Sequence, residues 1–211
     1  MTIIISGDTG VPVSPVTGTL AVLNGGTGVT TSTGSGANVL GTSPSISGAV
    51  MSTMASSVIT SGTAVASTSG TSIDFTGIPS WVKRITVMLS GVSTNGASQF
   101  IIQLGDSGGV ENSGYLGGAS RAATHIAQTT GFGITAATGA SSIQQGSVTV
   151  SLLNSSTFTW TSAGNLWDSY SVESNISAGG KSLSATLDRI RITTVNGTDT
   201  FDAGSINILY E

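Results

Sequence analysis

The chain has 211 residues, only 8% of them charged, and a formal net charge of -4 at pH 7. An ordinary soluble domain carries roughly 25% charged residues, so this chain depends on hydroxyl groups and backbone for its solubility. Because no basic stripe is present to neutralise phosphates, we expect no nucleic-acid binding. The absence of cysteine excludes a disulfide framework and thiolate chemistry.

The N-terminal quarter of the chain differs in composition from the rest. Met1 to Ile5 contains an apolar triplet but has no basic stretch and is too short for a signal peptide or membrane span, so we expect synthesis in a cytoplasm and no membrane insertion. Residues 1–50 are rich in Gly, Thr and Ser. Such a segment buries too little apolar surface to offset a backbone ordering cost of roughly 1–2 kcal/mol per residue. The sequence predicts an extended N-terminal attachment arm over residues 1–50, disordered alone or ordered by partners.

The second half of the stretch Thr71 to Val92 has the pattern of a strand. Ile85, Val87 and Leu89 alternate with polar or more exposed residue types, and a period of two is typical of a strand with one buried face. Pro79 precedes it, where no ladder hydrogen bond is required of a proline. We expect a central strand, with Trp81 covering one end of the core.

Short strands and turns continue to the C-terminus. The sequence predicts hairpins around Thr68 to Gly70, around Asn154 to Ser156 and at Asn196-Gly197, and a two-residue turn with positive φ at Asn95-Gly96. About ten short strands and no helical period indicate an all-β fold. We therefore expect an antiparallel β-sandwich, jelly-roll-like, as a head domain over residues 51–211 behind the N-terminal arm.

Two blocks of sequence carry a resemblance to a known group of proteins. The first runs from Leu23 to Gly34 and contains Asn-Gly-Gly-Thr-Gly, followed by Asn38-Val-Leu and by Thr42 to Gly48; the second runs from Thr71 to Gly96. Together they resemble segments of tail-fibre and tail-associated structural proteins of tailed bacteriophages. The resemblance implies a virion fibre, usually a homotrimer.

The glycines of the first block have a structural interpretation. No Lys or helix follows them to hold a phosphate, so close approach between chains explains them better. The predicted assembly and anchoring residues are Leu23, Asn24, Gly25, Gly26, Thr27 and Gly28.

Catalytic chemistry finds little support in the sequence. The only histidine, His125, has no nucleophile context and is interpreted as a surface or interface residue. Asp188, Asp199 and Asp202 lack the order of a calcium loop and are interpreted as turn carboxylates. We expect no catalytic residue, no metal and no cofactor, although facing carboxylates for glycoside cleavage are not excluded by spacing alone.

Aromatic residues concentrate in one segment of the chain. Phe158 and Trp160 are predicted to share the core face of a strand, whereas Trp167 and Tyr170 follow Ala163 and Gly164 in a loop-like stretch. An exposed indole beside amide and carboxyl groups suits a sugar ring; the alternative is packing in the core or against a neighbouring subunit. The candidate glycan-binding residues are Asn165, Trp167, Asp168 and Tyr170.

These observations predict a bacteriophage virion structural protein, of tail-fibre or receptor-binding type, and not an enzyme. The arm would dock on other virion proteins, and the head would contact the host surface, with host glycan as a candidate ligand. Two alternatives stay open: a capsid-decorating or head-fibre protein, and a small glycan depolymerase. The depolymerase alternative lacks the long repetitive coil of strands that such enzymes usually contain.

Overall fold

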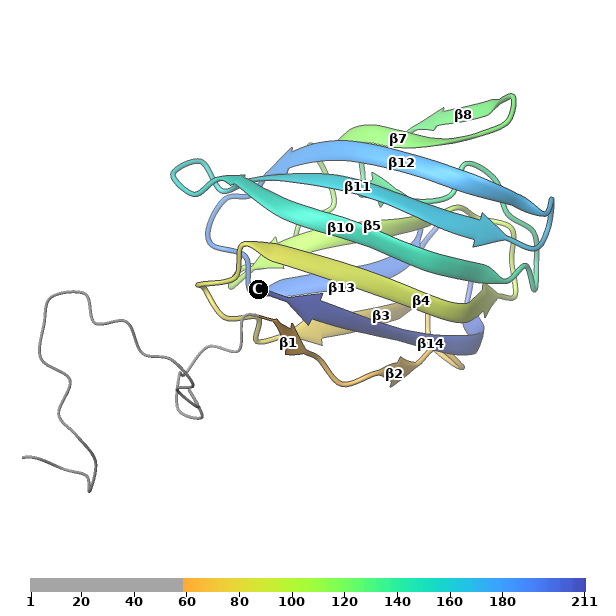
Figure 1. Cartoon of the computed structure of the whole chain (residues 1–211), viewed down its shortest axis with the longest axis horizontal. Coiled ribbons are helices and arrows are strands. Elements are labelled where there is room, and N and C mark those ends of the chain that lie inside the picture. Colours follow the sequence, from red (N-terminus) through yellow and green to blue (C-terminus); the bar gives the residue numbers. More distant parts are fainter. Residues whose placement is uncertain (1–58) are drawn as a thin grey trace, which may run out of the picture. The chain divides into compact units, whose positions relative to one another are not determined.

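The computed structural model describes residues 59–211, which form fourteen strands in two antiparallel sheets (Figure 1). The predicted all-β, antiparallel fold is confirmed for these residues. None of them belongs to a helix that is long and apolar enough to span a membrane. The predicted arm and its residues Leu23 to Gly28 lie outside the described residues and stay a prediction.

The larger sheet has nine strands, and the smaller has five. The larger consists of β1 (Thr60–Ser61), β2 (Val65–Ala66), β4 (Arg84–Thr94), β7 (Leu116–Arg121), β8 (Thr124–Ala127), β10 (Gln144–Asn154), β11 (Thr159–Asp168), β12 (Glu173–Ser182) and β14 (Phe201–Tyr210). The smaller consists of β3 (Ser72–Thr76), β5 (Phe100–Asp106), β6 (Gly109–Val110), β9 (Phe132–Gly133) and β13 (Arg189–Thr194).

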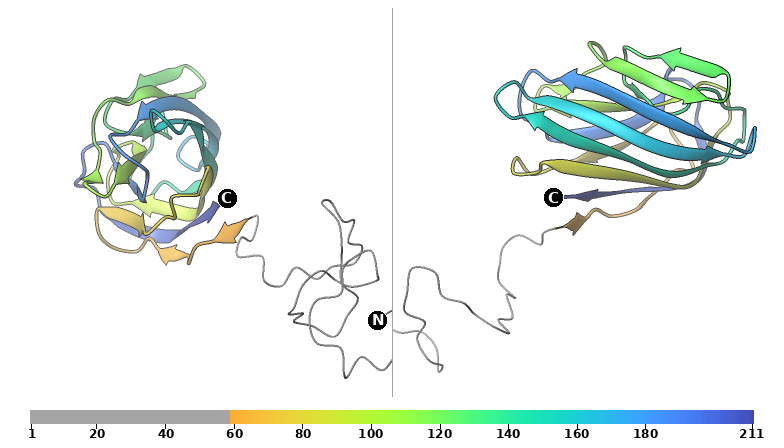
Figure 2. Two further views of the ribbon diagram at one scale, coloured as in Figure 1. Left: turned by 90° about the vertical axis from the view of Figure 1, so that its left-hand side faces the viewer. Right: turned by 45° about the horizontal axis from the view of Figure 1, so that its top comes forward.

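Strand order places the predicted central strand inside the larger sheet. The order there is β1-β14-β4-β10-β11-β12-β7-β8, with β2 also paired to β14, and the smaller sheet follows β3-β13-β5-β6, with β9 paired to β5. β4 lies between β14 and β10, so its edges are both covered. Seen along the strands, the two sheets curve around one core (Figure 2).

The core follows from the alternation in the sequence. Val87 is fully buried, and its neighbours across the sheet are Val148 on β10 and Ile208 on β14. Ile192 on β13 faces inward from the smaller sheet, between Ile73 and Ile102. Burial of each such side chain stabilises the fold by about 1.5–3 kcal/mol.

Several predicted turns connect the two sheets instead of forming hairpins. The segment Thr68 to Gly70 leads from β2 in the larger sheet to β3 in the smaller, so the hairpin prediction there is wrong. Asn196-Gly197 does turn the chain, with Gly197 at a φ of 66°, but it too crosses between sheets, from β13 to β14. The hairpin between β10 and β11 is confirmed.

The Asn95-Gly96 turn is also different from the prediction. Neither residue has a positive φ, so the two-residue hairpin turn is wrong at this position. A side chain at position 96 would meet the Asp199 carboxylate, which occupies the place of the Cβ and would have to move. The turn carries the chain from β4 to β5, again from one sheet to the other.

The two ends of the sandwich have different roles in the chain. At one end, here called the entry end, Ile59 and Glu211 line the same hollow, and Thr60 pairs with Tyr210. Trp81 lies at this end with its ring 5.9 Å from that of Tyr210, and it is partly exposed instead of fully buried. The opposite end, here called the loop end, carries the turns after β4, β11 and β13 and the 134–143 connection (Figures 1 and 2).

Candidate functional site

Four exposed apolar side chains gather at the loop end. Ile143 (42% exposed) precedes β10, Trp167 (41%) is the penultimate residue of β11, and Tyr170 (65%) and Val172 (73%) lie in the turn between β11 and β12. Ile143 and Ser169 exchange two hydrogen bonds of 2.8 and 3.0 Å, which tie the two connections together. Ile143, Trp167, Tyr170 and Val172 are called the tip below.

Trp167 lies on a strand, so the predicted loop there is wrong. β11 continues through Ala163 and Gly164 to Asp168, and Asn165 and Trp167 point to its outer face because alternate residues share a face. Gln145 on β10 and Ser174 on β12 are the cross-strand neighbours of Trp167, and both are exposed. The structure therefore brings Asn165 and Trp167 together on one uncharged surface.

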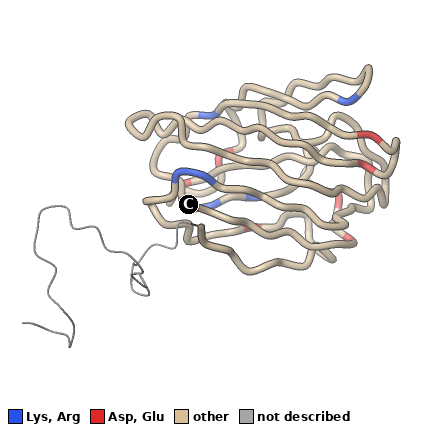
Figure 3. Tube along the Cα trace, in the orientation of Figure 1, with Lys and Arg blue, Asp and Glu red and all other residues tan. Residues whose placement is uncertain are grey.

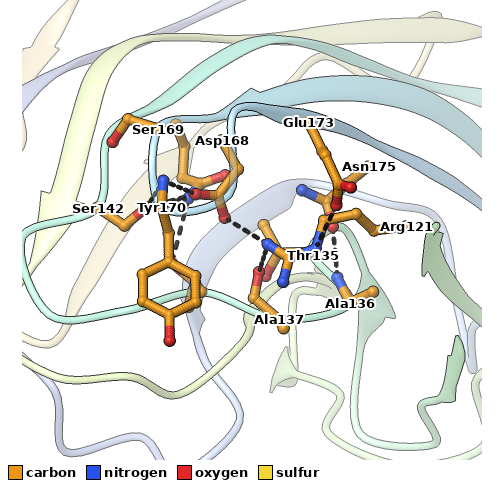
Figure 4. A network of polar contacts seen from close by, with 12 residues as sticks. Arg121, Thr135, Ala136, Ala137, Ser142, Asp168, Ser169, Tyr170, Glu173 and Asn175 are labelled. Carbon is orange, nitrogen blue, oxygen red and sulfur yellow. Dashed lines mark hydrogen bonds and ion pairs between the residues drawn. The ribbon is translucent and has the colours of Figure 1, made fainter. Parts of the chain in front are cut away.

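Tyr170 points in another direction. Its ring covers Gly139, where a Cβ would lie 2.5 Å from the ring, and its centroid is 5.9 Å from the Arg121 guanidinium carbon. Its backbone N–H donates to Asp168 Oδ1 at 2.7 Å and to Ser142 Oγ at 3.1 Å (Figure 4). No ring contact joins Tyr170 to Trp167 within residues 59–211, so the two aromatics form two neighbouring surfaces instead of one platform.

Asp168 supports the tip from beneath. Its side chain is fully buried, and Oδ1 accepts hydrogen bonds from the Ser142 hydroxyl and from the Tyr170 amide. A buried carboxylate presents no surface to a ligand. Of the four candidate glycan-binding residues, Asn165, Trp167 and Tyr170 are exposed and Asp168 holds the turn that carries Tyr170.

An ion cluster lies under the tip. Arg121, at the end of β7, is 9% exposed and lies 3.7 Å from Asp168 Oδ2 and 3.3 Å from Glu173 Oε2. The first distance is too long for a hydrogen bond, so the contact is electrostatic only. Arg121 also donates to the Ala137 carbonyl, and Asn175 accepts from the Ala136 amide at 2.7 Å (Figure 4). These contacts attach the 134–143 connection to the larger sheet.

Backbone strain is concentrated at this end. Three of the four non-glycine residues with positive φ in residues 59–211 are Ala122, Ser141 and Val172, all in connections at the loop end. Val172, with a φ of 58°, is β-branched, and such residues rarely adopt this conformation. Strain of this kind persists only where surrounding contacts determine the backbone, and it clusters at binding sites.

The other candidate residues form no second site. His125 is exposed on β8. Asp188 pairs with Arg189. Asp199 accepts hydrogen bonds from the Ser98 backbone N–H and from Asn196 Nδ2, and Asp202 accepts one from the Ser93 hydroxyl. Within the described residues, no three His, Cys, Asp or Glu side chains come close enough to hold a metal ion.

Sequence reasoning missed Ile143, Val172 and Arg121. Ile143 and Val172 are single apolar residues between Ser, Gln and Glu, a pattern that signals neither strand nor core. Arg121 is distant in sequence from Asp168 and Glu173, and only the pairing of β7 with β12 and of β12 with β11 brings them together.

Comparison with known proteins adds no family. No protein-family model, curated protein or solved structure matches the chain.

Proposed function

We propose that the chain is a structural protein of a bacteriophage virion, of tail-fibre or receptor-binding type, working by assembly and binding instead of turnover. The observation that carries the proposal is that two features lie at opposite ends of the sandwich. The chain enters at one end, next to Glu211, and the tip lies at the other. A head anchored through its N-terminal side presents its loop end outward. The resemblance of Leu23 to Gly48 and of Thr71 to Gly96 to tail-associated proteins supports the same assignment.

The tip has the chemistry for a host-surface ligand. The exposed indole face of Trp167 can stack on a sugar ring, and Gln145, Asn165 and Ser174 around it offer amide and hydroxyl groups for the sugar hydroxyls. Stacking on an aromatic side chain contributes about 1–3 kcal/mol where it has been measured for nucleic-acid bases, and we expect a similar order here. Tyr170 supplies a second ring beside it.

We further propose that the head works as a homotrimer. On the entry-end side of Asn165, the outward positions of β10, β11 and β12 carry Ser, Thr, Ala, Leu and Gly but no charged side chain, and the centre of this face is free of charge in Figure 3. Contact between such faces would desolvate no ions, and depletion of charge is typical of interface cores. Cyclic closure is the common solution for identical subunits.

The test combines location and adsorption. Antibodies against the sandwich should label the tail of virions by electron microscopy, and the purified full chain should compete with phage for adsorption to host cells. Trp167→Ala should weaken that competition, whereas Thr124→Ala, an exposed residue on β8 of the same sheet, should not. Label on the capsid together with no host binding would move the decorating-fibre alternative ahead, and absence from particles would overturn the proposal altogether.

A further inference from the structure

A second candidate site lies on the opposite face of the sandwich. The outer surface of the smaller sheet contains a hollow of about 260 Å³, near the loop end and lined among others by Gln103, Asn112, Thr130, Arg191 and Thr193. Ligand pockets usually measure about 300–1,000 Å³, so this hollow suits one small group, such as a single sugar ring. None of its lining residues is aromatic.

Three of the lining side chains are each held in place by one protein partner. Gln103 Nε2 donates to the Thr130 carbonyl at 2.9 Å, and the Thr193 hydroxyl donates to the Thr71 carbonyl at 2.7 Å. Arg191 forms a two-pronged pair with Asp74, at 2.7 Å from Nε and 2.8 Å from Nη2. Side chains fixed in this way lose little further freedom when a ligand binds.

The remaining polar atoms of these side chains are free for a ligand. Within residues 59–211, no hydrogen bond is made by Gln103 Oε1, by Arg191 Nη1 or by the Asn112 amide, and Thr193 Oγ1 can still accept. The hollow thus offers two acceptors, one guanidinium donor and one amide that can do both. A hydroxyl group both donates and accepts, so adjacent hydroxyls match this mixture.

The charge balance of the hollow argues against an anion. Asp74 neutralises Arg191, and no other ionisable side chain lines the hollow. The hydrogen bonds that Arg191 donates to Asp74 also raise the pKa of Arg191, so the guanidinium stays charged. An acidic ligand would have to compete with Asp74 for the guanidinium.

We propose that this hollow binds one uncharged, hydroxyl-rich sugar residue through hydrogen bonds alone, with Gln103, Asn112, Arg191 and Thr193 as its ligands. The source of the sugar, the host surface, is taken from the proposed function, and the inference rests on it in that respect. It is independent of Trp167, which lies on the other sheet and would bind by stacking.

The experiment uses the full chain and soluble probes. Methyl glycosides of glucose, galactose and N-acetylglucosamine are compared at millimolar concentration with the methyl glycoside of glucuronic acid, by saturation-transfer and amide-shift NMR. We expect a neutral glycoside to bind and to shift amides of β5 and β13, and the acidic one not to bind. Asn112→Ala, an exposed residue without hydrogen bonds in the described part of the chain, should weaken binding about fivefold to tenfold, and Asn154→Ala, an exposed asparagine at the end of β10 outside both candidate sites, is the matched control.

A charge variant sharpens the test. Asp74→Asn leaves Arg191 unpaired, so this variant should gain affinity for the glucuronide while the parent does not. Failure of every neutral probe to bind, or binding that Asn112→Ala leaves unchanged, would overturn the inference. Loss of binding in Trp167→Ala alone would reject the hollow and retain the proposed function, because the tip would then be the sugar site.

Discussion

The two ends of the sandwich are closed by different chemistry. At the entry end, Val82, Trp160, Leu183 and Leu187 are buried as part of the apolar core, and Lys181 and Asp106 are the buried charged residues. At the loop end the inward positions hold Arg121, Gln144, Asp168 and Asn175, all nine-tenths or more buried. Apolar closure stabilises in proportion to area, whereas buried ions roughly offset their desolvation and define one geometry. The comparison indicates that the polar cluster under the tip mainly defines its geometry, whereas the apolar side chains at the entry end mainly add stability.

The largest effect should come from removing the buried indole of Trp160 at the entry end. Trp160→Ala leaves a cavity in the core and should lower the free energy of unfolding by about 3–5 kcal/mol. Trp167→Ala, the same substitution on the exposed face of the same strand, should cost less than about 1 kcal/mol. Urea unfolding measures both, and equal losses would show that the ends do not differ as described.

Breaking the buried ion pair should have the next largest effect. Asp168→Ala leaves Arg121 buried without its inner partner and removes one of the two acceptors of the Tyr170 amide, so we expect a loss of about 3 kcal/mol. Glu173→Ala, which removes the more exposed partner of the same arginine, should cost about 0–1 kcal/mol. If adding Arg121→Met to Asp168→Ala restores no stability, the uncompensated charge is not the cause.

Relief of the backbone strain at Val172 should raise stability and weaken adsorption. Val172→Gly removes a Cβ from a backbone at positive φ, and we expect unfolding stability to rise by about 0.5–1 kcal/mol. Adsorption to host cells should fall, because the turn that carries the tip becomes less defined. A melting curve and an adsorption assay on the same preparation test this, and a gain in both would show that the strain serves no binding role.

The smallest effect on stability should appear only at acidic pH. Hydrogen bonds from the Ser184 hydroxyl and the Gly108 N–H hold the pKa of Asp106, at the entry end, below its ordinary value of 3.8. A lowered carboxyl pKa contributes stability that is complete above the ordinary value and is lost as the pH falls through the folded value. Asp106→Asn should therefore flatten the acid limb of stability against pH and change its neutral plateau less. An unchanged acid limb would assign the acid sensitivity to other carboxylates, Glu111 among them.

The sequence predicted the local features well and the long-range ones poorly. Alternation located β4, β10 and β14, because burial of one face repeats every second residue. Gly164 suggested a loop, but it lies on strand β11. A glycine suits this strand position because Val148 approaches closely, with Val148 Cγ2 2.6 Å from the position of an added Cβ. The same alternation, continued through Leu166, turns Asp168 inward, and a loop interpretation of the segment hides that.

Turn signals identified where the chain reverses but not which sheet it joins. Asn196-Gly197 and Thr68 to Gly70 reverse the chain as predicted, yet each passes from one sheet to the other. That choice depends on which side of the core has room for the next strand, which is a property of the packed molecule. The tip and its ion cluster depend on the same choice, so sequence patterns recovered Trp167 and Tyr170 but not Arg121.

The position of Ile59 opposite the tip has a mechanical consequence. For a head anchored through Ile59 and held by its ligand at the loop end, tension runs along the strands, since both points lie at strand ends (Figure 1). A pull in that direction loads the short pairings of β1 and β2 with β14 in shear, whereas a pull across the sheet would open them one after another. Such a geometry would suit the anchored, surface-binding head proposed above.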